Sequence, residues 1–158
     1  MYSKHKSYTL EDALEKLQKY CSYQDRCHME VEQKLKSMGM IPQASDQILM
    51  TLIEENYLNE ERFAMAYVRG KFRIKQWGRI RLKAELKKRQ ISSYLIKKAL
   101  TQISESKYIT TFETLAERKA ETLVGTNNRL KKKKLIDYLM YRGWESHLIY
   151  DKVNQLLS

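Results

Sequence analysis

The segment Glu85-Leu86-Lys87-Lys88-Arg89-Gln90 has the pattern of a helix that ends in a turn, and related segments occur before and after it. Lys34-Leu35-Lys36-Ser37-Met38-Gly39 precedes it, and Tyr138-Leu139-Met140-Tyr141-Arg142-Gly143 follows it. The turn positions 39, 90 and 143 lie 51 and 53 residues apart. A period near 50 indicates a tandem array of small helical units, each of which buries its apolar face against its neighbours.

Apolar residues recur with helical spacing around each of the three turns. The chain has only 5 Gly and 1 Pro in 158 residues, too few for the many tight turns of a β-sandwich or barrel. The fourth expected helix follows the cap Asn59, runs to about Gln76 and has Phe63, Tyr67 and Ile74 on one side. The expected helix-boundary residues are Thr9 with Asp12, Gly39, Pro42, Asn59, Ser92 or Ser93, Thr110 or Thr111, Gly125 and Gly143.

We therefore predict an all-α fold, an elongated, curved tandem array of three three-helix repeats with nine helices in total. The first repeat covers residues 1–57, the second and strongly basic repeat covers 58–107, and the third covers 108–158. Because sequence similarity between the units is weak, a coincidence of helical patterning is the alternative interpretation.

Positive charge is concentrated in the middle of the chain. The whole sequence carries a formal net charge of +11. Residues 62–98 hold 13 basic side chains and one acidic side chain, Glu85, whereas the segments before and after them carry −4 and +3. Such a concentrated positive field favours a polyanionic partner, with nucleic acid the first candidate and an acidic protein surface the second.

The basic residues of this segment follow helical spacing. Arg62, Arg69 and Arg73 fall at i, i+7 and i+11 and predict one cationic stripe, and Arg79, Lys83 and Lys87 fall at i, i+4 and i+8 on the next helix. The predicted binding patch comprises Arg62, Arg69, Lys71, Arg73, Lys75, Arg79, Arg81, Lys83, Lys87, Lys88 and Arg89. A second basic cluster, at the start of a later helix, comprises Arg129, Lys131, Lys132, Lys133 and Lys134.

For both groups, a solvated helix face is the alternative to a binding role. Phe72 and Trp77 lie among the basic residues. They either stack on unpaired nucleobases or pack in the core, and core packing is the preferred interpretation.

The central segment also resembles a known family. Leu58-Asn59-Glu60-Glu61-Arg62-Phe63-Ala64, then Val68-Arg69, then the stretch from Trp77 to Arg89, are similar to the central signature of the RecX family. Ala13-Leu14 and the stretch from Glu32 to Gly39 resemble the family's first repeat, and Arg142-Gly143-Trp144 carries the likeness in the last third. Two features depart from the family pattern: three extra residues near Pro42, and Gln90 where the family often has Gly.

The resemblance implies a non-enzymatic regulator of the bacterial recombinase RecA, built from three tandem three-helix repeats. Such a regulator docks in the groove of a RecA filament on DNA and mainly inhibits the ATPase, strand-exchange and coprotease activities, in DNA repair and the SOS response. The expected partners are the RecA filament and single- and double-stranded DNA without sequence specificity. We expect a monomer. We also expect it in the cytoplasm, because neither a long apolar stretch nor a signal-peptide pattern is found in the sequence.

Catalytic and metal-binding patterns find little support. Cys21, Cys27, His28 and His147 lack zinc-finger spacing, and glycine-rich phosphate loops are not found, so we expect no enzyme activity, no metal and no cofactor. The alternative function is a helix-turn-helix-like transcriptional regulator that reads DNA sequence. We prefer the RecA modulator, because Ser92-Ser93-Tyr94 and Glu145-Ser146-His147 offer few base-reading groups at the starts of the third helices.

Overall fold

The computed structural model describes residues 7–125 and 127–158, and within them the chain forms nine α-helices and one π-helical segment. The segment Met1 to Lys6, part of the stretch examined for a signal peptide, lies outside the described residues. The first repeat contains α1 (Leu10–Tyr23), α2 (His28–Ser37) and α3 (Pro42–Glu54). The second contains α4 (Glu60–Gly70), η1 (Lys71–Lys75), α5 (Arg79–Lys88) and α6 (Ser93–Leu100), and the third contains α7 (Glu105–Thr122), α8 (Asn128–Tyr141) and α9 (Ser146–Leu157). The third repeat is counted here from the start of α7 at Glu105, three residues before the expected boundary at 108.

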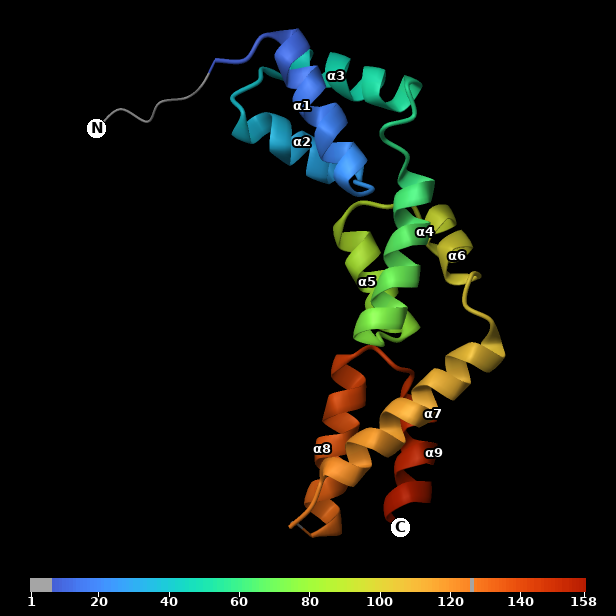
Figure 1. Cartoon of the computed structure of the whole chain (residues 1–158). Helices are drawn as coiled ribbons and strands as arrows, with labels where there is room; N and C mark the ends of the chain where they lie inside the picture. Colours follow the sequence, from blue (N-terminus) through green and yellow to red (C-terminus); the bar gives the residue numbers. More distant parts are fainter. Residues whose placement is uncertain (1–6, 126) are drawn as a thin grey trace, which may run out of the picture.

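The three helical groups follow one another along an extended molecule, with the first group at one end and the C-terminus at the other (Figure 1). The predicted all-α array of three-helix units is therefore confirmed. Within the described ranges, no helix combines the length and the apolar character that a bilayer crossing requires.

The aligned turns of the three units share one backbone conformation. Gly39, Gln90 and Gly143 have φ angles of 75°, 61° and 87°, which places each of them in the left-handed region. This conformation ends the second helix of each unit and redirects the chain into the third. Gln90 thus adopts the conformation that Gly adopts more readily at the two other turns.

Three helices, α1, α4 and α6, begin at side-chain caps that the sequence indicates, namely Thr9, Asn59 and Ser92. Thr9 Oγ1 accepts a hydrogen bond from the Asp12 N–H at 3.1 Å, and Asn59 Oδ1 accepts one from the Arg62 N–H at 2.9 Å. The prediction that Thr110 or Thr111 begins the seventh helix is wrong. Ser104 caps it instead, because its hydroxyl accepts from the Lys107 N–H and the longer helix buries Tyr108 against the core.

Ile74, expected on the same side as Phe63, is not buried with it, although the helical segment does continue to Lys75. After Gly70 the α-helix changes into the π-helical turn η1, which holds more residues per turn than an α-helix. The wider turn shifts the phase of the following side chains. Phe72 still follows the helical spacing from Val68 and is buried, whereas Ile74 is 67% exposed.

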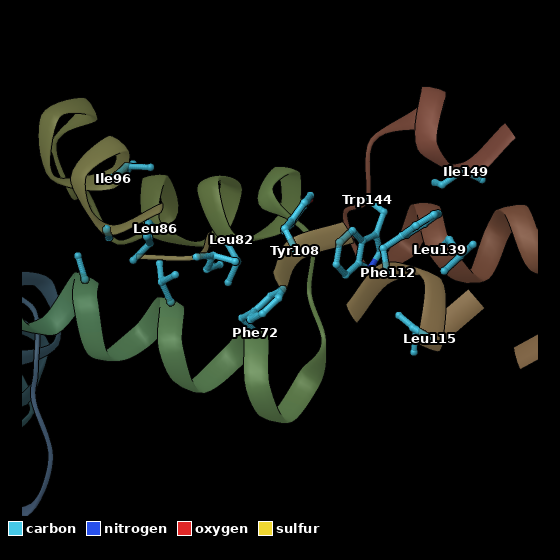
Figure 2. Packing of buried hydrophobic residues seen from close by; sticks show 14 of the residues in the cluster. Phe72, Leu82, Leu86, Ile96, Tyr108, Phe112, Leu115, Leu139, Trp144 and Ile149 are labelled. Carbon is cyan, nitrogen blue, oxygen red and sulfur yellow. The ribbon is translucent and has the colours of Figure 1, made fainter. Parts of the chain in front are cut away.

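The buried apolar residues of the described chain form two hydrophobic cores. The first repeat has its own core, which includes Leu17, Leu35 and Leu52. The second and third repeats share one continuous core, in which Tyr108 and Phe112 lie against the fully buried Trp144 (Figure 2). The ring centroid of Trp144 is 4.6 Å from that of Tyr108 and 5.2 Å from that of Phe112.

Backbone contact locks the second repeat to the third. The Gly78 N–H donates to the Arg142 carbonyl at 2.8 Å, and the Ile80 N–H donates to the Gly143 carbonyl at 3.0 Å. A Cβ on Gly78 would lie 2.4 Å from the Gly143 oxygen, so only glycine fits there without movement. The start of α5 is therefore seated directly on the end of α8, and the side chains on both helices have a fixed relation to one another.

Candidate functional site

The structure divides the predicted basic patch into residues that hold the array together and residues that face outward. Arg62 belongs to the first group. Its Nε is 2.6 Å from Asp25 Oδ1, and its guanidinium also donates to the carbonyls of Asn56 and Tyr57. Arg62 thus ties the second repeat to the loop between α1 and α2, and it does not form one exposed stripe with Arg69 and Arg73.

Arg79 and Arg81 lie at the joint between the second and third repeats. Arg79 pairs with Glu105 at 2.6 Å and with Glu145 at 3.3 Å, and its guanidinium carbon is 3.7 Å from the ring centroid of Tyr108. Burial alone would lower the pKa of Arg79, but the hydrogen bond to Glu105 and the nearby negative charges raise it. The charge of Arg79 is therefore neutralised within the fold.

Arg81 contributes to the same joint. Its guanidinium donates to the Tyr141 carbonyl at 3.1 Å and lies between the rings of Trp77 and Tyr141. Trp77 is half-buried beneath Arg81 and Lys71, and Phe72 is buried. The preferred interpretation of Phe72 as a core residue is confirmed, and two protein cations, Lys71 and Arg81, lie over the ring of Trp77.

Glu85, the single acidic residue among these basic residues, pairs with Lys88 and Arg89 on its own helix at 3.4 and 3.2 Å. Burial would raise the pKa of Glu85, but the hydrogen bonds from Arg89 and Lys88 lower it, so the carboxylate stays charged. Arg89 also lies over the ring of Tyr67. Lys88 and Arg89 therefore already have partners within the second repeat.

Four cations of the patch face solvent without a protein partner. Among the residues that the structure describes, these exposed side chains have no ion pair or hydrogen bond: Arg73, Lys75, Lys83 and Lys87. We call this set the outer row. Arg73 and Lys75 are on η1, whereas Lys83 and Lys87 are one turn apart on α5. Removing their charge would cost the fold no ion pair, so they are available to an external polyanion.

Arg69 and Arg73 line a surface hollow of about 480 Å³ between the α4–η1 segment and the start of the third repeat. Ala66, Phe72 and Ile103 contribute apolar surface to it. Two residues of this hollow were missed in the sequence: Gln102, whose Oε1 accepts from Arg69 at 2.8 Å, and Lys107. Lys107 was missed because the helix that carries it was expected to start later.

The second basic cluster lies apart from the first. It occupies the start of α8, at the C-terminal end of the array, whereas η1 and α5 lie near the middle (Figure 1). Lys133 pairs with Asp137 at 2.8 Å, and Arg129 and Lys134 are exposed. Arg129, Lys132 and Lys133 also line a hollow of about 500 Å³ with Ile136 and Leu157. The second basic cluster and the outer row therefore lie on separate surfaces of the described structure.

Groups that would support catalysis are scarce around these sites. Within residues 7–125 and 127–158, no three His, Cys, Asp or Glu side chains are arranged to hold a metal ion. Burial raises the pKa of Cys27 to about 11, so its thiol stays protonated near neutral pH.

Comparison with known proteins identifies the family. The second three-helix domain of RecX matches residues 59–100, and the third three-helix domain of RecX matches residues 107–153. A protein of Chlorobaculum tepidum named regulatory protein RecX is 30% identical over 129 residues, which cover 82% of this chain and 78% of that protein. The chain belongs to the RecX family.

Other RecX proteins agree with this assignment. Regulatory protein RecX of Lactobacillus johnsonii is 30% identical over 97 residues, and the match covers 61% of this chain but only 36% of that longer relative. The crystal structure of RecX from Lactobacillus salivarius superposes with a TM-score of 0.78 at 26% identity, covering 93% of this chain and 96% of that one. The whole helical array, beyond the two matched domains, is thus shared with a RecX protein of known structure.

Proposed function

We propose that this RecX chain binds RecA filaments on DNA as a monomer and lowers their ATPase, strand-exchange and coprotease activities without catalysing a reaction of its own. The family name supports a regulatory role. The observation that carries the proposal is the outer row. Arg73, Lys75, Lys83 and Lys87 are exposed and unpaired in the described structure, in a chain with a net charge of +11.

Unpaired cations repel one another, and an external polyanion relieves that repulsion. The joint between the second and third repeats fixes the positions of η1 and α5 before a partner arrives, which reduces the entropy lost on binding. The second basic cluster, on a different repeat, can contact the same extended partner at a second point. An elongated array with two basic sites therefore suits a long anionic filament.

The sequence-reading alternative receives less support. Base readout needs donors and acceptors at the exposed start of a helix that enters the major groove. Ser92 caps α6 through its own hydroxyl, and Glu145, before α9, accepts from Tyr108 and pairs with Arg79. The unpaired cations lie on η1 and α5 instead, where they suit contacts to phosphates or carboxylates.

The direct test is the ATPase of RecA on single-stranded DNA with added protein. The test variant carries Ala in place of Arg73, Lys75, Lys83 and Lys87. The matched control carries Ala in place of four exposed lysines of the first repeat, Lys16, Lys19, Lys34 and Lys36, and so loses the same charge. We expect inhibition to weaken at least tenfold in the test variant and by less than threefold in the control. Equal inhibition by all three proteins would overturn the role of the outer row.

Binding to bare DNA provides a second readout. If about five phosphates are neutralised, the logarithm of the binding constant should fall with the logarithm of salt concentration at a slope of about −4. The outer-row variant should have a shallower slope. A flat response of the unmodified protein would exclude direct phosphate contact.

A further inference from the structure

At one glycine of the chain, neither a positive φ angle nor a close contact requires glycine. Gly39, Gly125 and Gly143 have positive φ angles, and a Cβ on Gly78 would collide with the third repeat. Gly70 instead has ordinary helical angles, φ −67° and ψ −48°. A Cβ built on it meets nothing within 4 Å. Since glycine is among the least favourable residues in a helix, its presence at an unobstructed helical position suggests that a group outside the molecule approaches the backbone there.

Gly70 lies between two hollows. Together with Ala66 it borders both the hollow of about 480 Å³ and a second one of about 240 Å³. The first hollow also contains Arg69, Phe72, Arg73, Gln102, Ile103 and Lys107. The second also contains Tyr67, Lys71, Ile74 and Lys75. The two small residues thus form a low saddle in α4, with cations on both sides, and the described residues that line the two hollows include no acidic side chain.

We propose that an acidic segment of the filament's protein component crosses α4 over Gly70 and places one side chain in each hollow. This inference rests on the proposed function, and it names the part of the filament that meets this surface. Carboxylates of the segment would pair with cations of the rims, such as Arg73, Lys75 and Lys107. Its apolar side chains would cover Ile74, which is 67% exposed, and fill the apolar floor beside Ala66.

The composition of the hollows favours a protein segment over nucleic acid. An unpaired base needs an open aromatic face on which to stack. Phe72, the aromatic residue of the larger hollow, is only 5% exposed, and Lys71 lies over Tyr67 at the smaller one. A phosphate backbone would also leave Ile74 without an apolar partner. A mixed apolar and cationic surface is better matched by an acidic protein segment with apolar anchors.

The test replaces Gly70 with a larger side chain that is compatible with a helix. Gly70→Gln fills the saddle without changing the charge, and Ser22→Gln, at an exposed site on α1, is the matched control. Binding is measured to RecA filaments on immobilised single-stranded DNA with a non-hydrolysable ATP analogue, and to the same DNA alone. We expect Gly70→Gln to raise the thermal midpoint, to weaken filament binding at least tenfold and to leave binding to bare DNA unchanged.

Each other outcome overturns a specific step. Unchanged filament binding by Gly70→Gln would remove the saddle as a docking site. Weaker binding to bare DNA would assign the saddle to nucleic acid instead. A lower thermal midpoint, repeated in Gly70→Ala, would show that the α4–η1 turn itself requires glycine. Failure of the unmodified protein to bind filaments would overturn the proposed function as well, whereas the first three outcomes would leave it intact.

Discussion

The joint between the second and third repeats can be tested by adding a single methyl group. Gly78→Ala places a Cβ 2.4 Å from the Gly143 oxygen and 2.8 Å from the Trp144 Cα, well inside van der Waals contact. Because Gly78 has φ −78° and ψ 172°, alanine adopts its backbone conformation without strain. Any loss of stability therefore comes from the contact between repeats.

The magnitude follows from what must separate. To relieve the contact, the start of α5 has to move by about 1 Å. This movement weakens the hydrogen bonds from Gly78 and Ile80, which are 2.8 and 3.0 Å long and contribute about 1 kcal/mol each. Repacking around the buried Trp144 adds about 1 kcal/mol, and the reduced freedom of the unfolded chain offsets about 0.5 kcal/mol. We expect a net destabilisation of about 2 to 3 kcal/mol.

Urea unfolding followed by circular dichroism measures this change. Gly70→Ala is the matched control, because the same substitution there meets open space and should stabilise the helix by about 0.5 to 1 kcal/mol. The two variants thus carry the same chemical change with opposite expected signs. A free energy of unfolding for Gly78→Ala within about 0.5 kcal/mol of the unmodified protein would refute the rigid joint.

Three further perturbations test other parts of the fold. Gln90→Gly should raise the unfolding free energy by about 0.5 to 1 kcal/mol, because glycine relieves the left-handed backbone at φ 61°; a lower thermal midpoint would contradict this. Burial raises the pKa of Cys27 to about 11, so the buried neutral thiol contributes fully to the free energy of unfolding below about pH 9. This contribution, about 2 to 3 kcal/mol, is lost as the pH rises through 11. The alkaline loss of stability should be smaller in Cys27→Ala, and an equal loss in both proteins would exclude this thiol as its cause. Arg62→Ala should cost about 1 kcal/mol, discounted for its partial exposure, and a double-mutant cycle with Asp25→Ala should show coupling rather than additivity.

The sequence was sufficient for the helical array because local patterns determine most of it. Apolar spacing, the caps at Thr9 and Asn59, and the aligned turns at Gly39, Gln90 and Gly143 each depend on a few neighbouring residues. The π-helical turn was not predictable in this way. The buried residues keep α-helical spacing as far as Phe72. The wider turn rotates the side chains that follow, so the spacing places Ile74 on the wrong side of the helix.

The candidate site was harder to predict because the partners of its cations are remote in sequence. Arg62 pairs with a residue 37 positions earlier, and Arg79 pairs with Glu145, 66 positions later. The distribution of charge along the sequence therefore indicates the basic segment. It does not distinguish cations that pair within the fold, such as Arg62 and Arg79, from the outer row. Gly70 carried a visible signal, since a glycine inside a helical pattern is unfavourable unless a backbone approach requires it.

Co-sedimentation with RecA filaments formed on single-stranded DNA, compared with DNA alone, tests the central claim most directly. The unmodified chain should pellet with filaments at low salt and progressively less as salt increases. The outer-row variant should remain largely in the supernatant, while the first-repeat control pellets normally. Equal pelleting of the outer-row variant and the unmodified protein at every salt concentration would contradict the account.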